Sequence, residues 1–136
     1  MIDELPEPTP DQDSKPFWDG LVQGEVRLQR CLGCGALRWP ARAICNRCAS
    51  FEAEWIASNG RGLVSSWIRT HQVFAPAYRD RVPYVVVQVS FVDQADVRMI
   101  GGWASDREPV VGEFVAPHFT RRESGTVVLD WAPRRT

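Results

Sequence analysis

Lysine and histidine are scarce in this sequence, and long apolar runs are missing. Lys15 is the one lysine among 16 basic residues, and His71 and His118 are the two histidines. No apolar run approaches the roughly 20 residues that a membrane-spanning helix needs, so we expect no membrane span. The first residues are acidic and contain no apolar segment of the kind found in secretion signals. We therefore expect a cytoplasmic protein.

Catalytic signatures are also missing. The sequence contains no G-x-S-x-G nucleophile turn, no Walker loop and no dinucleotide-binding glycine pattern. His71 and His118 both fall on, or at the end of, a predicted strand, where a lone histidine is more often a hydrogen-bonded structural residue than a base. We expect no catalytic residues, and no independent enzymatic activity.

Charge is distributed unevenly along the chain. Residues 1–13 contain five acids, three prolines and no base, which predicts a disordered acidic tail. The remaining residues, 14–136, hold 16 bases against 12 acids, a net charge of +4. Arginine favours planar, bidentate partners such as carboxylate and phosphate groups. A biased composition of the source genome explains the excess of arginine equally well.

All four cysteines occur as two Cys-x-x-Cys pairs separated by ten residues, namely Cys31, Cys34, Cys45 and Cys48. Two such pairs supply the four thiolates of a tetrahedral zinc site, and Gly35 permits the backbone turn that the first pair needs. Two disulfides would suit a secreted protein, and a redox pair would leave the other pair without a role. The spacing thus predicts a zinc ribbon with one structural Zn²⁺ per chain, because four thiolates leave no open position for catalysis.

A short helix is predicted before the ribbon. In residues 14–24 the side chains of Phe17, Trp18, Leu21 and Val22 recur at helical spacing. A helix of about two turns is marginally stable alone, so its apolar face has to pack against something. That surface could be the chain's own core or a partner protein, and the sequence leaves both alternatives open.

Beyond residue 59 the pattern changes to strands. One strand is predicted in the ribbon at 25–30, and five follow at 63–74, 83–92, 97–103, 113–119 and 126–131. Five strands with glycines at the bends favour a small OB-type barrel, with an SH3-like barrel as the alternative. We expect a mainly β chain with this division: 1–13 acidic tail, 14–59 helix and zinc ribbon, 60–132 barrel, 133–136 C-terminal tail.

Several motifs occur in a characteristic order along the chain. They are Phe17-Trp18, Leu28-Gln29-Arg30-Cys31-x-x-Cys34-Gly35, Trp39-Pro40-x-Arg42-x-x-Cys45-x-x-Cys48, Gly60-Arg61-Gly62-x-Val64-x-Ser66, Pro83-Tyr84-Val85 and Val110-Val111-Gly112-x-x-Val115. From about residue 14 to its end, the chain resembles the OB-fold proteins with a rubredoxin-like zinc ribbon, long called domain of unknown function thirty-five. Trp39 departs mildly from the family, which often has phenylalanine there, and the acidic tail is not part of the pattern.

The resemblance implies a function as well as a fold. It implies a rubredoxin-like zinc ribbon packed on an OB barrel, in a non-catalytic accessory subunit of a thiolase-like enzyme that acts on acyl-CoA. The partner would be a thiolase or a lipid-transfer-type thiolase that serves as a steroid side-chain aldolase. We expect Phe17, Trp18 and Leu21 to bind the partner, and Arg61 and Arg69 to bind anionic groups of ligand or partner. The accessory subunit would help to form or cover the acyl-CoA site.

A single-stranded nucleic-acid binder is the rival class, because zinc ribbons and OB barrels both serve that purpose. Trp67 or Phe74 could stack on bases, beside a groove of arginines at 69, 79, 81, 98, 121 and 122. However, a net charge of +4 is modest for such a protein, and these aromatic residues are equally suited to a barrel core. We expect no nucleic-acid partner.

Overall fold

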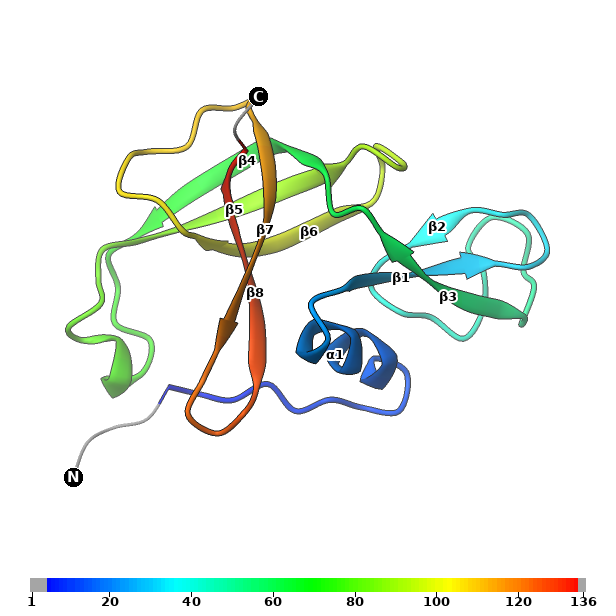
Figure 1. The fold of residues 1–136 in the computed structure, drawn as a ribbon, viewed down its shortest axis with the longest axis horizontal. Helices are drawn as coiled ribbons and strands as arrows, with labels where there is room; N and C mark the ends of the chain where they lie inside the picture. The colour runs from blue at the N-terminus through cyan, green and yellow to red at the C-terminus, as the bar shows by residue number, and fades with distance from the viewer. Residues whose placement is uncertain (1–4, 135–136) are drawn as a thin grey trace.

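The computed structural model describes residues 5–134, which form a short helix, a small three-stranded ribbon and a closed five-stranded barrel (Figure 1). Helix α1 (Lys15–Val22) precedes β1 (Val26–Cys31), β2 (Leu37–Arg38) and β3 (Ala53–Ser58), which pair in the order β2-β1-β3. The barrel contains β4 (Gly62–Thr70), β5 (Tyr84–Phe91), β6 (Arg98–Trp103), β7 (Phe114–Arg121) and β8 (Val127–Pro133). Within residues 5–134, neither helical segment has the length and hydropathy needed to cross a bilayer.

The barrel closes in the order β4-β5-β6-β8-β7, with β7 returning to β4. The neighbouring strands are antiparallel except β6 and β8, which run parallel and pair Gly102 with Asp130. Closure depends on a short contact between β4 and β7, at Gly62↔Val115 and Leu63↔Phe114. This closed arrangement confirms the predicted five-stranded OB-type barrel.

Alternating side chains explain why these segments become barrel strands. Along β5, Val87, Val89 and Phe91 are buried while the residues between them are more exposed. Trp131 of β8 is fully buried and meets Phe91 edge-on, with ring centroids 5.7 Å apart. At Gly101 of β6, a Cβ would lie 2.8 Å from both the indole of Trp131 and a backbone oxygen of β8. Glycine there lets β6 pass closely over the central tryptophan.

The helix and the ribbon share one core with the barrel. Phe17 and Leu21 of α1 and Leu28 of β1 are buried in the same cluster as the barrel residues Val89 and Trp131. Figure 1 shows α1 beneath the ribbon on the side that faces β8. Phe17 and Leu21, two of the apolar side chains of α1, are therefore covered by the chain itself.

The predicted strand at 63–74 is four residues too long. β4 ends at Thr70, which pairs with Tyr84 at the start of β5. The intervening residues form a loop with a short 3₁₀ helix, η1 (Pro76–Tyr78), and expose Phe74 to solvent. Pro83 has no N–H to extend the ladder beyond Tyr84, so β4 has no partner there. The other predicted strands differ from the observed bounds by one or two residues; β8, for example, reaches Pro133.

The segment before α1 runs along the turn between β7 and β8 (Figure 1). Arg122 donates a hydrogen bond to the carbonyl oxygen of Pro6 at 2.8 Å, and its guanidinium lies 3.5 Å from the Glu7 carboxylate. Ser124 donates to Glu7 at 3.3 Å. Residues 1–4 lie outside the described residues, and disorder of the segment 1–13 stays a prediction.

Candidate zinc centre and apolar groove

The four cysteine sulfurs converge at one place in the ribbon. Their Sγ atoms all lie within 4.8 Å of one another, with Cys31–Cys48 at 3.5 Å and Cys34–Cys45 at 3.7 Å. Zinc–sulfur bonds of about 2.3 Å in a tetrahedron place the sulfurs about 3.8 Å apart. A disulfide would need about 2.05 Å, and all four cysteines are free. The predicted ligand set therefore fits one Zn²⁺, which would cross-link the ribbon and leave no position for substrate.

Two matching turns position these ligands. In the first, Gly35 has φ +78° and its N–H donates to the carbonyl oxygen of Cys31 at 2.9 Å. In the second, Ala49 has φ +63° and donates to the carbonyl oxygen of Cys45, also at 2.9 Å. The left-handed conformation expected at Gly35 is confirmed, and Ala49 adopts the same conformation with a side chain that opposes it.

Backbone N–H groups and neighbouring sulfurs shift the pKa values of two thiols in opposite directions. Backbone N–H groups of Arg47 and Cys48 point at the Cys45 sulfur and lower the pKa of that thiol to about 6. For Cys48, the N–H of Ser50 favours the thiolate, but nearby sulfurs, first that of Cys31, outweigh it and raise the pKa to about 12. Four thiolates this close repel one another, and a dication at their centre would remove that repulsion.

The two turns predict substitutions of opposite sign. Gly35→Ala should lower the stability of the zinc-bound ribbon by about 1 kcal/mol, because alanine is strained at positive φ. No atom lies within 4 Å of the new Cβ, so backbone strain should account for the whole effect. Ala49→Gly should raise it by up to about 1 kcal/mol. Competition for zinc against a chelator of known affinity measures both. Shifts of the same sign in the two variants would contradict the left-handed geometry of the turns.

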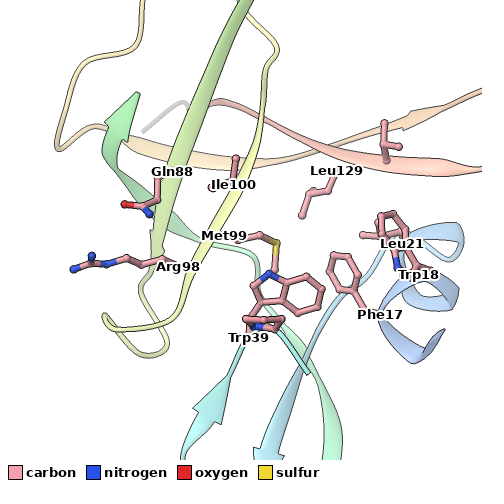
Figure 2. Close-up of a pocket in the computed structure, with 11 residues that line it drawn as sticks. Phe17, Trp18, Leu21, Trp39, Gln88, Arg98, Met99, Ile100 and Leu129 are labelled. Atoms are coloured by element: carbon pink, nitrogen blue, oxygen red, sulfur yellow. The ribbon is translucent and has the colours of Figure 1, made fainter. Parts of the chain in front are cut away.

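An apolar groove of about 400 Å³ lies where the helix and ribbon meet the barrel (Figure 2). Figure 2 shows α1 and Trp39 on one side, and Met99, Ile100 and Leu129 on the other. Its polar lining comes from Gln88 and Arg98, and its apolar lining from Phe17, Trp18, Leu21, Trp39, Pro40, Met99, Ile100, Val128 and Leu129. The guanidinium of Arg98 extends away from the apolar part.

The three helix residues predicted to bind a partner differ in exposure. Phe17 and Leu21 are 3% and 1% exposed, and Phe17 packs on Trp39 with ring centroids 4.2 Å apart. Their burial favours the alternative left open by the sequence, packing in the chain's own core. Trp18 is partly buried and packs in a T-shaped arrangement with Phe17, with ring centroids 5.3 Å apart. Of the three, Trp18 is the side chain with surface available to a partner.

The two arginines predicted to bind anions lie at opposite ends of β4. Arg61 precedes the strand and is exposed, whereas Arg69 is next to its last residue. Arg69 donates to Glu108 at 2.6 Å and lies over the Trp67 ring at 5.8 Å. The structure therefore does not bring Arg61 and Arg69 together, and neither lines the groove.

The ribbon is attached to the barrel by the β5–β6 turn, a contact that sequence reasoning missed. The Gln94 side-chain amide accepts a hydrogen bond from the N–H of Leu37 at 2.9 Å and donates to its carbonyl oxygen at 2.8 Å. Ser58 donates to Asp93 at 2.9 Å, and Arg47 forms an ion pair with Asp96. These bonds hold the part of the ribbon that carries Trp39, one side of the groove, against the barrel. In the sequence, Gln94 is one polar residue in a predicted turn.

The two histidines are not brought together. His71 follows the end of β4, and His118 lies on β7 opposite Asp130 of β8. β7 pairs with β4 only at Gly62 and Leu63, the end of β4 remote from His71. Residues 5–134 therefore do not bring the two histidines into one site.

Comparison with known proteins supports the ribbon assignment. Residues 18–54 match the family described as ChsH2, rubredoxin-like zinc ribbon domain. A probable enoyl-CoA hydratase alpha subunit from Thermomonospora curvata is 32% identical over 88 residues, covering 65% of this chain and 27% of the relative. The 3-oxo-4,17-pregnadiene-20-carboxyl-CoA hydratase alpha subunit of Mycobacterium tuberculosis is 33% identical over 99 residues, covering 73% and 30%. The chain thus spans less than a third of the length of these relatives.

Solved structures share the whole architecture. The structure named "Ltp2-ChsH2(DUF35) aldolase" superposes with a TM-score of 0.82 at 24% identity, covering 93% of this chain and 98% of that one. A DUF35-family protein of unknown function from Sulfolobus solfataricus gives 0.61 at 15% identity, covering 90% and 86%. At these identities the likeness establishes the fold. The ribbon match and the shared fold confirm the resemblance inferred from the sequence: residues 18–54 match a ChsH2-type rubredoxin-like zinc ribbon, and the chain has the fold of the DUF35 structures.

Proposed function

We propose that the chain is a non-catalytic accessory subunit of an acyl-CoA-processing enzyme complex. It docks on a thiolase-like enzyme, a thiolase or a lipid-transfer-type steroid side-chain aldolase, and helps to form or cover the acyl-CoA site. The observation that carries the proposal is the open apolar groove between α1, the ribbon and the barrel. The relatives' names, two hydratase alpha subunits and an aldolase that contains Ltp2, support the same class of complex.

The groove has the properties of a docking surface. Its volume of about 400 Å³ falls in the range of ligand and side-chain pockets, about 300–1,000 Å³. Ile100 at its edge is 66% exposed, and Trp18 presents an indole, a side chain enriched among residues that dominate binding energy. The hydrogen bonds from Gln94 to Leu37 fix the ribbon side of the groove. Binding would therefore cost little conformational entropy from ordering that side. An apolar group of a partner or of its acyl substrate would remove this surface from water.

Two arginines, one of them at the edge of the groove, are candidate partners for anionic groups. Arg98, at its edge, and Arg61 form no ion pair among residues 5–134, unlike Arg69. Unpaired arginines suit the acidic side chains of a partner or the phosphates of CoA. Binding of acyl-CoA by the complex is therefore part of the proposal, with Arg98 added to the arginines expected from the sequence.

Substitutions in the groove test the docking surface. Trp18→Ala and Ile100→Ser should each weaken binding to a purified lipid-transfer-type thiolase by about 2–4 kcal/mol if they are central anchors. Val22→Ala on the same helix and Ile68→Ser on the barrel are matched controls, because these residues are 49% and 60% exposed outside the groove. Isothermal titration calorimetry measures the binding, and thermal melting verifies that each variant is folded.

Activity assays test the accessory role separately. The chain alone should cleave or hydrolyse no acyl-CoA thioester, while the enzyme with the chain should exceed the enzyme alone in acyl-CoA turnover. Turnover by the isolated chain, lost in His71→Ala or His118→Ala, would contradict a non-catalytic role. Equal loss of binding in the groove variants and their controls would place the interface elsewhere.

A further inference from the structure

Arg38 is a buried arginine that has no acidic partner among residues 5–134. Arg38 is 5% exposed, and its Nε donates a hydrogen bond to the side-chain amide oxygen of Gln29 at 2.7 Å. Its Nη2 donates to the carbonyl oxygen of Arg42 at 2.9 Å, and Nη1 is buried with no hydrogen-bond partner among the described residues. Both acceptors are neutral. Burial of a cation without a counter-charge carries a large desolvation penalty, which indicates that a further group is bound here.

A polar cavity lies beside this arginine, at the junction of ribbon and barrel. It has a volume of about 70 Å³. Its polar lining residues are Arg38, Arg42, Asn46, Arg47, Gln94 and Asp96, and its apolar ones are Leu37, Trp39 and Val97. Asp96 is the one acid, and it is already bound by Gln94 at 2.7 Å and by Arg47, which together lower its pKa. Arg47 neutralises Asp96, so Arg38 and Arg42 leave a net charge of +2 around the cavity.

We propose that this cavity binds one small tetrahedral oxyanion, a phosphate or sulfate group. Its volume equals roughly two water molecules, too small for a nucleotide or an acyl chain but suited to a single oxyanion group. Guanidinium groups match such oxygens with paired, charge-assisted hydrogen bonds. The bound anion would supply the counter-charge that Arg38 lacks and join the second cysteine turn, through Arg47 and Asn46, to the β5–β6 turn. The inference is independent of the proposed partner.

Titration of the zinc-loaded chain with inorganic phosphate tests this site. We expect saturable, one-to-one binding by calorimetry in a chloride buffer of constant ionic strength, with zinc content unchanged. Arg42→Gln should weaken binding at least tenfold; Arg42 is exposed, so the fold should survive its replacement. Arg79→Gln, an exposed arginine outside the cavity, is the matched control and should bind phosphate like the native chain.

Phenyl phosphate in a parallel titration identifies the source of the anion. Binding of both compounds assigns the site to a phosphomonoester carried by a larger ligand, and binding of phosphate alone assigns it to the free ion. The absence of saturable binding by either compound would overturn the proposal, because ordered water would then satisfy Arg38. Equal weakening in Arg42→Gln and Arg79→Gln would also overturn it, since general charge screening would then explain the effect.

Discussion

Removal of zinc should unfold residues 26–56. The ribbon has little structure of its own, since β2 contains two residues and no helix or strand lies between it and β3. Binding of a structural zinc contributes about 10–16 kcal/mol, as much as the whole stability of a typical domain. Hydrogen exchange followed by mass spectrometry should therefore show rapid exchange throughout 26–56 after chelation. Leu28 belongs to the common core, so protection of the adjoining barrel strands should also fall.

Two substitutions in the first cysteine turn separate loss of the metal from damage to the turn. Cys34→Ser removes a ligand and should release zinc, whereas Leu32→Ser changes a neighbouring side chain that is 55% exposed and should retain it. Elemental analysis counts the metal in each variant. Less than about half an equivalent of zinc in the native chain, purified without chelator, would contradict a closed four-thiolate site. So would undiminished protection of 26–56 after zinc removal.

Replacement of Phe17 should have the next largest effect, on folding. Phe17→Ala should lower the free energy of unfolding by about 3–5 kcal/mol, because a buried phenylalanine leaves a cavity that its neighbours fill only in part. Phe17 contacts Trp39 of the ribbon and lies in the cluster that contains Trp131 of the barrel. The loss should therefore loosen α1, the ribbon and the barrel together. Urea denaturation followed by tryptophan fluorescence measures it.

The control for Phe17→Ala is Val22→Ala on the same helix. Val22 is 49% exposed, so its replacement should change the free energy of unfolding by less than about 0.5 kcal/mol. One outcome for Phe17→Ala would instead make Phe17 a direct partner-binding residue. If Phe17→Ala leaves the melting temperature unchanged and still abolishes the complex, its side chain must turn outward to reach the partner.

The zinc ligands and the barrel strands were accessible from sequence because their signals are local. Two Cys-x-x-Cys pairs determine a ligand set regardless of the surrounding fold, and Gly35 marks the turn that positions them. In the same way, alternation of Val87, Val89 and Phe91 specifies one buried face of β5. The Gly60-x-Gly62 interruption, from which we predict the division between ribbon and barrel, is a local signal of the same kind. These features depend on residues that are close in the chain.

The groove and the polar cavity could not be predicted, because they arise from residues far apart in the chain. Trp18 and Ile100 line one groove only after α1 and β6 pack together, and Gln94 reaches Leu37 across 57 positions. The aromatic stripe on α1 fitted a core and a partner surface equally, and only packing distinguished Phe17 from Trp18. The length of β4 was misjudged for a related reason: β5 ends the pairing at Thr70.

Sedimentation with an enzyme partner decides whether the chain is an accessory subunit. The zinc-loaded chain would be sedimented with a purified lipid-transfer-type thiolase, and separately with a labelled single-stranded oligonucleotide, at physiological salt. We expect a stable complex of defined stoichiometry with the enzyme, and an oligonucleotide that sediments free. Tight oligonucleotide binding that weakens steeply with salt, together with no enzyme complex, would rule out the accessory role.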